Sequence, residues 1–186
     1  MEFVIGIIAV IVILPLIFVL IQYNHLVSLK NYIKNSWSNI DTELKRRYDL
    51  IPNLVATVKG YAKHESEVLE NVTRFRNQCQ ANQGPIHEQA VDETLLVGSL
   101  QRLFVVVEDY PELKANENYL LLQKELINTE DRIQAARRFF NGNVKDYNNK
   151  CEMVPSNIVA GMFGFQRAEF FEVEAESERA PVKVQF

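Results

Sequence analysis

Hydrophobic and polar positions divide the chain into an uncharged N-terminal segment and a mixed remainder. Nineteen consecutive uncharged residues, rich in Ile, Val and Leu, run from Phe3 to Ile21. As a helix this segment would be roughly 28 Å long, which matches the hydrocarbon core of a bilayer. The alternatives are a buried helix of a soluble protein and a secretory signal peptide, but no Lys or Arg precedes the segment and no small-residue cleavage site follows it. The pattern predicts a transmembrane anchor at residues 1–24, with residues 3–22 in contact with lipid.

Beyond residue 24, apolar residues recur every three or four positions, which is the spacing of one face of an α-helix. Four prolines divide this part of the chain, and each is expected to mark a helix boundary: Pro52, Pro85, Pro111 and Pro155. The apolar faces expected of the four helices are Leu26, Leu29, Ile33, Trp37, Ile40, Leu44 and Tyr48; Leu54, Val55, Val58, Ala62, Leu69, Val72 and Phe75; Ile86, Ala90, Leu96, Leu100, Leu103, Phe104 and Val107; and Tyr119, Leu122, Leu126, Ile133, Phe140, Val144, Tyr147 and Cys151.

No stretch alternates with period two over a useful length, so no strand is predicted. Short connections at residues 49–52 and 82–85 would turn successive helices back on one another, and Asn116 is placed to cap the fourth helix, whose spacing is like that of a coiled coil. The predicted fold class is all-α: an N-terminal transmembrane helix that continues into an antiparallel, up-down four-helix bundle at residues 25–154.

The end of the chain is expected to have two parts. Residues 155–171 are apolar, and in an up-down bundle they would return to the membrane, where they would cap the bundle or lie in the lipid interface. The favoured alternative is a tail packed back against the bundle, because only Arg167 supplies a positive charge for anionic lipid. Residues 172–186 are predicted to be a flexible tail.

The distribution of charge predicts where the protein lies in the cell and how it is oriented in the membrane. The chain carries 20 basic and 24 acidic side chains, for a net charge of −4, and an acidic body without a basic-aromatic surface excludes a nucleic-acid-binding class. Only Glu2 precedes the anchor, whereas Lys30 and Lys34 follow it closely. The positive-inside rule therefore predicts a single-pass protein with its N-terminus outside and its bundle in the cytoplasm. Cys79 and Cys151 would then be thiols, although a disulfide in an oxidising space is an alternative.

The residues of the chain do not form a known catalytic or metal-binding pattern. None of the three histidines has a Glu three positions before it, and the sequence holds no glycine-rich phosphate loop, no Gly-x-Ser-x-Gly and no Cys-x-x-Cys. We therefore predict no catalytic residue, no cofactor and no metal site.

Polar residues do gather near the first predicted turn and on the fourth predicted helix: Arg46, Arg47 and Asp49, and Glu125, Asn128, Glu130, Arg132, Arg137 and Arg138. Arg47 follows Leu44 by three positions and so lies on or beside the apolar face. We expect Arg47 to form an inter-helix ion pair with Glu125 or a close neighbour, which would set helix register. The alternative is a partner-binding patch.

Several segments resemble the LemA family. They are KRRYDLIPNLVATVKGYAKHE at residues 45–65, YPELKA at 110–115, ELINTEDRIQAARR at 125–138, FN at 140–141 and PSNIVAG at 155–161. The resemblance implies a bacterial inner-membrane protein with an outward N-terminus and a cytoplasmic helical bundle. It also implies an association with membrane metalloproteases or with the building of magnetosome membranes, and it implies no particular reaction.

These observations lead to one functional expectation and one alternative. The protein is expected to be a membrane-anchored helical scaffold or adaptor without enzymatic activity, acting in self-assembly or membrane organisation. Its expected partners are the bilayer, other membrane or cytoplasmic proteins such as a membrane metalloprotease, and a second copy that meets the apolar stretch Leu103–Val107 around Val105. The alternative is an enzyme or sensor with a ligand pocket in the bundle.

Overall fold

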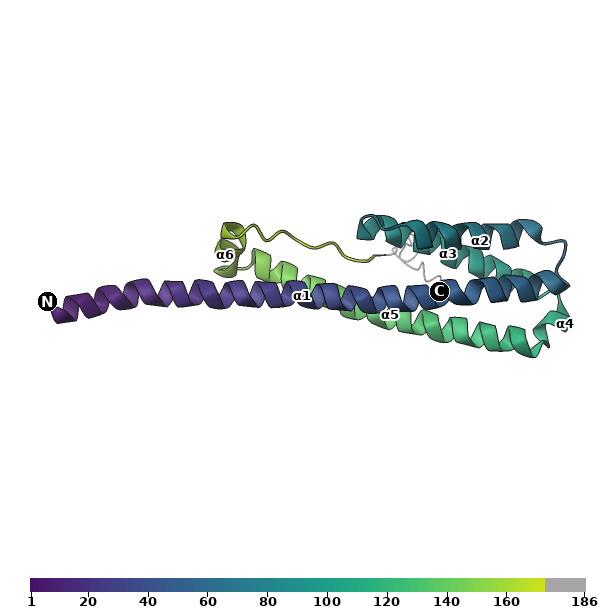
Figure 1. Ribbon diagram of the computed structural model, residues 1–186, viewed down its shortest axis with the longest axis horizontal. Coiled ribbons are helices and arrows are strands. Elements are labelled where there is room, and N and C mark those ends of the chain that lie inside the picture. Colours follow the sequence, from purple (N-terminus) through teal and green to yellow (C-terminus); the bar gives the residue numbers. More distant parts are fainter. Residues whose placement is uncertain (173–186) are drawn as a thin grey trace, which may run out of the picture. The chain divides into compact units, whose positions relative to one another are not determined.

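A computed structural model describes residues 1–172, apart from the side chains of residues 2, 4, 5 and 7–10. The secondary structure of these residues is entirely helical (Figure 1): α1 (Glu2–Tyr61), α2 (Ser66–Ala81), α3 (Ile86–Val107), α4 (Pro111–Lys114), α5 (Glu117–Glu152) and α6 (Ser156–Met162). The predicted all-α class is confirmed. The flexible tail predicted at residues 172–186 lies, beyond Glu172, outside the described residues.

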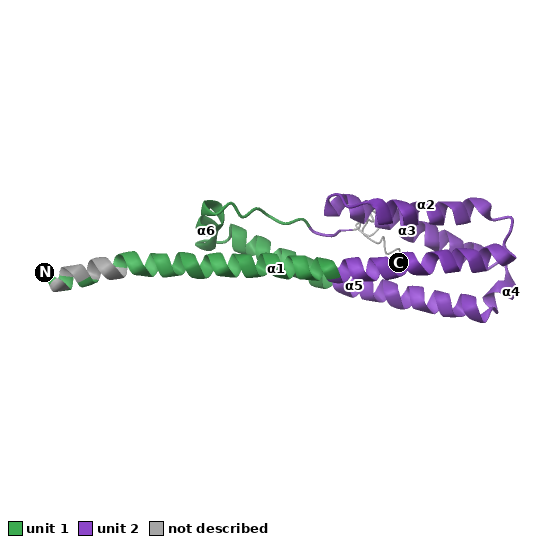
Figure 2. Cartoon of the chain, viewed as in Figure 1, with its two compact units in different colours: residues 1–38, 138–169 green, residues 39–137, 170–186 purple. Residues whose placement is uncertain are grey.

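The chain divides into two compact units (Figure 2). Unit 1 comprises residues 1–38 and 138–169, and unit 2 comprises residues 39–137 and 170–186. Because α1 and α5 contribute to both, each unit combines segments that are distant in the sequence.

Unit 1 contains the N-terminal part of α1, the C-terminal part of α5, and α6. Its core cluster is Leu26, Tyr147, Val159 and Ala160, with Phe18, Val19, Leu29, Ile33, Cys151, Phe165 and Ala168 packed against it. Asn148 holds the segment after α6 through two hydrogen bonds: its Nδ2 donates to the Ala168 carbonyl at 3.0 Å, and its Oδ1 accepts from the Ala168 amide at 2.8 Å. The α6 segment is thus part of a packed core.

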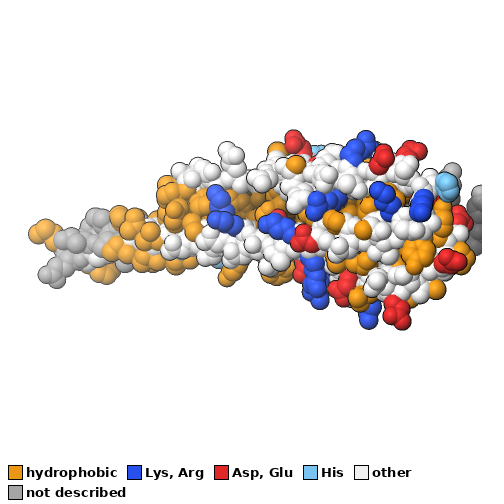
Figure 3. Space-filling view, turned by 45° about the vertical axis from the view of Figure 1, so that its right-hand side comes forward, with side chains coloured by type: hydrophobic (Ala, Val, Ile, Leu, Met, Phe, Trp, Pro, Cys, Tyr) orange, Lys and Arg blue, Asp and Glu red, His pale blue; other side chains and the backbone are white. Residues whose placement is uncertain are grey.

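The N-terminal part of α1 is long and apolar enough to cross a membrane, with a mean hydropathy of 1.9 over its most apolar window. Hydrophobic side chains cover its visible face (Figure 3). Every side chain from Ile11 to Ile21 is exposed except Phe18 and Val19, which are half-buried. Apolar side chains exposed along a whole stretch of helix are what a lipid environment accommodates.

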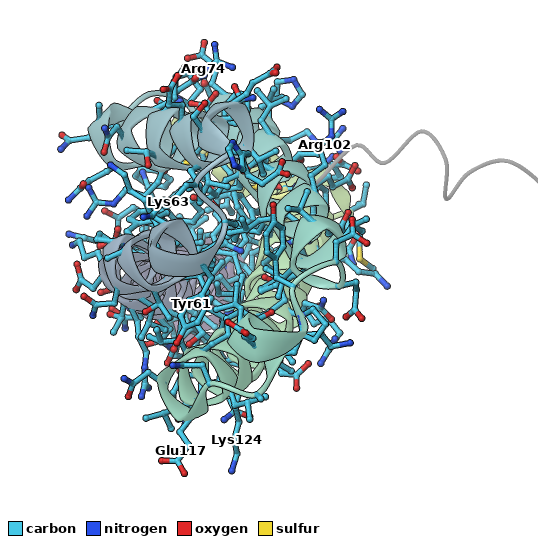
Figure 4. The ribbon with its side chains drawn as sticks, turned by 90° about the vertical axis from the view of Figure 1, so that its right-hand side faces the viewer. Tyr61, Lys63, Arg74, Arg102, Glu117 and Lys124 are labelled. Atoms are coloured by element: carbon cyan, nitrogen blue, oxygen red, sulfur yellow. The ribbon has the colours of Figure 1, made fainter. Side chains whose placement is uncertain are left out.

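In unit 2, the second half of α1 runs beside α2, α3 and the first part of α5 (Figures 1 and 4). The apolar faces predicted from the sequence are buried or half-buried at every position named for them. Charged side chains such as Arg74, Glu117 and Lys124 point away from the helices (Figure 4). The core is therefore the set of facing apolar stripes that the helical periodicity indicated.

The prediction that Pro52 ends a helix is wrong. Helix α1 continues through Pro52 to Tyr61, and the first turn lies at residues 62–65. Proline has no N–H to donate to the carbonyl four residues earlier, which here belongs to Tyr48. Arg76 of α2 supplies the missing donor, because its Nε donates to the Tyr48 carbonyl at 3.1 Å. The helix is thus completed by a side chain from another element.

The other three prolines lie at helix boundaries as predicted, and each stands at a helix start. Pro85, Pro111 and Pro155 stand at the beginnings of α3, α4 and α6, and the connection at residues 82–85 joins α2 to α3. Asn116 caps α5 as expected, because its Oδ1 accepts a hydrogen bond from the Tyr119 amide at 3.0 Å.

Candidate functional site

A buried ionic cluster lies between helices of unit 2, and we call it the Arg47 network: Arg47 and Tyr48 of α1, Glu93 of α3 and Glu130 of α5. The side chain of Arg47 is only 3% exposed. Its Nη2 donates to Glu93, and its Nη1 donates to Glu130 at 2.7 Å. One guanidinium therefore joins α1 to two other helices.

Glu93 is the buried acidic centre of the network. Its side chain is 5% exposed, and it lies on the apolar face of α3 between Ala90 and Leu96. One carboxylate oxygen accepts from Arg47 and the other from the Tyr48 hydroxyl. A buried carboxylate with both oxygens hydrogen-bonded and a cation beside it is compensated for its loss of water, whereas removal of either partner would leave a buried charge.

Two protonated groups lie near this carboxylate. Burial raises the pKa of the Tyr48 phenol, and the negative charge of Glu93 raises it further. Burial and Glu93 also raise the pKa of the Cys79 thiol on α2. Because the thiolate is the nucleophilic form of cysteine, Cys79 is held in its unreactive form at neutral pH.

A cavity of about 580 Å³ adjoins the network in unit 2. Helices α1, α3 and α5 line it, together with Phe171, and its lining includes Arg47, Glu93, Gly98 and Glu130. The Nε of Arg47 is buried and has no hydrogen-bond partner within the described part of the chain. The cavity is therefore lined by both apolar and charged side chains, among them three members of the Arg47 network.

The sequence-predicted ion pair exists with different partners. Arg47 does form an inter-helix ion pair, but its partner on α5 is Glu130, and Glu125 instead pairs with the more exposed Arg46 at 3.5 Å. The prediction put Arg47 near Glu125 because it placed the first turn at Pro52, at the same end of the bundle as the start of the fourth helix. The turn lies at residues 62–65 instead, and Glu130 is the residue of α5 that pairs with Arg47.

The remaining predicted residues do not join the network. Asp49 and Arg138 are exposed and Asn128 is half-buried. Arg132 lies 3.9 Å from Glu43, and the guanidinium of Arg137 lies over the ring of Phe171 at 5.2 Å from its centroid. Sequence reasoning missed Glu93 altogether. The available signal was its position, because a carboxylate three residues from Ala90 and from Leu96 falls on an otherwise apolar helical face.

The three histidines, His25, His64 and His87, are all exposed. Among residues 1–172, no three or more His, Cys, Asp or Glu side chains are grouped so as to hold a metal ion.

Comparison with known proteins shows the family to which this chain belongs. The model of the LemA family matches residues 36–186, which is most of the chain. The chain belongs to the LemA family. The match includes every residue of the Arg47 network and begins after the apolar part of α1.

Three similar relatives are two magnetosome proteins named MamQ and one protein named LemA. Magnetosome protein MamQ 2 of Paramagnetospirillum magneticum is 26% identical over 178 residues, and magnetosome protein MamQ of Magnetospirillum gryphiswaldense is 25% identical over 177. Each comparison covers 82% of this chain and 65% of the relative, so the chain spans slightly less than two thirds of these proteins. Protein LemA of Metamycoplasma hominis is 28% identical over 163 residues, covering 86% of this chain and 72% of that protein. None of these names denotes an enzymatic activity.

Proposed function

We propose that this LemA-family protein is a membrane-anchored helical scaffold or adaptor without enzymatic activity. In this proposal residues 3–22 span the bilayer, and residues 25–154 form an antiparallel, up-down four-helix bundle that presents helix faces to other proteins. The observation that carries the proposal is α1 itself, which exposes apolar side chains at residues 11–21 and places Ile40, Leu44 and Ile51 in a protein core.

The chemistry of the Arg47 network supports a structural role. Arg47 and Glu93 neutralise each other, and the raised pKa values of Tyr48 and Cys79 keep both groups protonated. An active site instead needs an acid, base or nucleophile whose pKa is tuned toward neutrality. A buried pair that joins three helices fits the selection of one helix register.

The location we propose is the bacterial inner membrane, with the N-terminus outside and the bundle in the cytoplasm. Lys30 and Lys34, which follow the apolar segment, favour this orientation. Other membrane or cytoplasmic proteins are the proposed partners, and a membrane metalloprotease is one such class.

Self-association is a second part of the proposal. Val105 on α3 is 70% exposed, although the stretch around it is apolar, and its neighbours Leu103 and Val107 are buried. An exposed apolar residue of this kind is suited to a contact with another chain.

Co-purification in mild detergent tests the proposal. A photo-cross-linking residue at Val105 should capture a second copy or a stoichiometric partner, whereas one at the exposed Glu112 of α4 should not. Recovery of monomer alone from Val105, at native protein levels, would contradict the scaffold proposal.

The cavity beside the Arg47 network supports a second candidate, a sensor or enzyme that binds a small molecule in unit 2. A Cβ added at Gly98 would meet no atom within 4 Å, so side chains can be built into this space. Native mass spectrometry of the purified chain should then show a retained molecule that Gly98→Leu displaces. An unliganded mass for both proteins would exclude this candidate.

A further inference from the structure

Helix α6 shares a packed cluster with the apolar part of α1. Within unit 1, Val159 and Ala160 of α6 are buried in the cluster that includes Leu26, and Phe18 and Val19 pack against that cluster. The ring of Phe163 lies 4.8 Å from that of Tyr23 between centroids. Because Phe18 and Val19 belong to the uncharged run 3–21, α6 reaches the level of its last residues.

The same segment also carries large apolar side chains that are exposed. We call them the α6 surface: Met153, Val154, Ile158, Met162 and Phe163, which are 62%, 77%, 61%, 67% and 50% exposed. Soluble surfaces rarely gather large apolar side chains so densely, and contiguous patches of this kind mark contacts with membranes or partners.

The distribution of charge points to lipid. No charged residue occurs in the 14 positions from Met153 to Gln166, whereas charges stand immediately outside, at Glu152 and Arg167. These two form an ion pair, with Arg167 Nε 3.0 Å from Glu152 Oε1. This ion pair thus flanks an uncharged segment, as expected where a segment of chain enters the edge of a bilayer and leaves it again.

We propose that the α6 surface lies in the interface of the same bilayer that α1 crosses, as a second lipid-contacting element of the protein. This proposal rests on the proposed function, because the anchor brings α6 to the membrane. Phe18 is three residues before Ile21 and packs against the cluster that holds Val159 and Ala160, so this cluster reaches about 4–5 Å inside the end of the uncharged run. Interfacial helices are commonly buried to a depth of this order.

Lipid is the occupant that the contacts favour over a protein. Phe18 and Val19 lie within the segment proposed to span the bilayer, and they pack against the cluster that holds Val159 and Ala160, so α6 is at membrane depth already. Arg167 is the one basic residue between Met153 and Phe171, and this scarcity of positive charge does not weaken the proposal, because the anchor and not electrostatic attraction brings α6 to the membrane. Contact should therefore occur in zwitterionic vesicles.

Fluorescence quenching by brominated lipid tests this inference on the full-length chain in phosphatidylcholine vesicles. The variant is Phe163→Trp, and the matched control is Phe139→Trp, which is in the same unit and is also exposed, at 61%. Phe139 adjoins Phe140, which contacts Trp37, and Trp37 is 16 residues beyond Ile21, or roughly 24 Å along α1. Wild type, which carries only Trp37, supplies the baseline that is subtracted from both variants.

Lipid brominated near the headgroup end of its acyl chains should quench most of the emission that Phe163→Trp adds, and this emission should be shifted to shorter wavelength than that of Phe139→Trp. Emission from the control should be quenched by aqueous acrylamide instead. The same result is expected for Met162→Trp, which guards against a folding defect in one variant.

Equal, weak lipid quenching of Phe163→Trp, Met162→Trp and the control would overturn the proposal. Protection of both α6 variants from acrylamide and from brominated lipid alike would also overturn it, because a protein would then cover the surface. Flotation of the vesicles separates this failure from that of the proposed function. A chain that floats without quenching at α6 refutes the α6 contact alone, and a chain that does not float refutes the anchor.

Discussion

Pro52 lies inside α1 and has no N–H for the Tyr48 carbonyl. A side chain of α2 donates a hydrogen bond to this carbonyl instead. The Tyr48 carbonyl accepts from Arg76 Nε at 3.1 Å, while the Tyr48 hydroxyl donates to Glu93. A single residue of α1 therefore contacts α2 through its backbone and α3 through its side chain. The cost of an interior proline is offset here by a bond between helices.

This geometry predicts coupling between Pro52 and Arg76. Arg76→Ala should lower the free energy of unfolding by about 1–2 kcal/mol, because it leaves the Tyr48 carbonyl without a donor. In a Pro52→Ala background, the restored N–H at position 52 can serve that carbonyl, so the same change should cost clearly less. Urea unfolding of the four proteins in detergent measures the difference.

Arg74→Ala is the control, because Arg74 is exposed on the same helix and bonds only to Asn71 of α2 among its hydrogen-bond partners in the described chain. Its cost should be small and the same in both backgrounds. Additive costs for Arg76→Ala and Pro52→Ala would show that the Arg76 bond does not compensate for the proline.

The Arg47 network predicts a large difference between two neighbouring arginines. Arg47→Ala should cost about 3–5 kcal/mol of stability, because it leaves the carboxylate of Glu93 buried and without its cation. Arg46→Ala should cost at most about 1 kcal/mol, because its pair with Glu125 is solvent-exposed. Similar losses of melting temperature in the two variants would contradict the assignment of the buried pair to Arg47.

The buried thiol predicts how stability depends on pH. Folding raises the pKa of Cys79 above its ordinary value, so the thiol stays protonated in the folded chain while the unfolded chain loses this proton above about pH 9. The stability that the protonated Cys79 thiol contributes to the folded chain is complete below that pH and is lost as the pH rises above it. The melting temperature should therefore fall above about pH 9, and less steeply in Cys79→Ala.

Cys151→Ala is the comparison for this measurement, because Cys151 is half-buried and lies outside the network. It should change the alkaline slope less than Cys79→Ala does. A slope unaffected by Cys79→Ala would show that other groups cause the alkaline loss.

Among the helices, the sequence was sufficient to predict the buried faces, but it placed the boundary between the first two helices at Pro52 instead of at residues 62–65. Apolar periodicity identified the buried positions, and Pro85, Pro111 and Asn116 marked real helix starts. Pro52 was misleading, because its effect on α1 depends on Arg76, which is 28 positions from Tyr48 in the sequence and approaches it only in the tertiary fold. Local rules cannot include such a donor.

Some residues of the candidate site could be predicted from the sequence and others could not. Arg47 was recognisable from its place beside Leu44, but the choice between Glu125 and Glu130 depends on a register that periodicity fixes only loosely. Glu93 was overlooked because it carries no motif, although its place on an apolar face was visible. The cavity depends on side-chain packing, which the order of residues does not reveal.

Helix α3 carries a testable weakness at Gly98. This glycine is in the helix interior, and a Cβ there would meet no atom within 4 Å. Gly98→Ala should stabilise the protein by about 0.5–1 kcal/mol, because alanine loses less backbone entropy on folding. Gly164→Ala should destabilise it, because Gly164 has φ +69°, a conformation that alanine adopts with strain. Urea unfolding should give opposite signs, and equal signs would contradict this description of the two positions.

The molecule as a whole carries two kinds of segment on one chain. The segment 3–21 has no charge, whereas the entire chain carries 44 charged side chains and a net charge of −4. Such a separation is expected of a protein that is held at a membrane and works beside it. The LemA family membership and the names of the MamQ relatives are compatible with this role, and the anchor is the property on which the role depends.

Alkaline carbonate extraction of membranes from bacteria that express the full-length chain tests the anchor most directly. We expect the protein to stay in the membrane pellet. A double variant with arginine at two exposed positions of the segment, Leu14→Arg and Ile17→Arg, should appear in the supernatant. Release of the unmodified chain into the supernatant would contradict the proposal that residues 3–22 anchor the protein in the membrane.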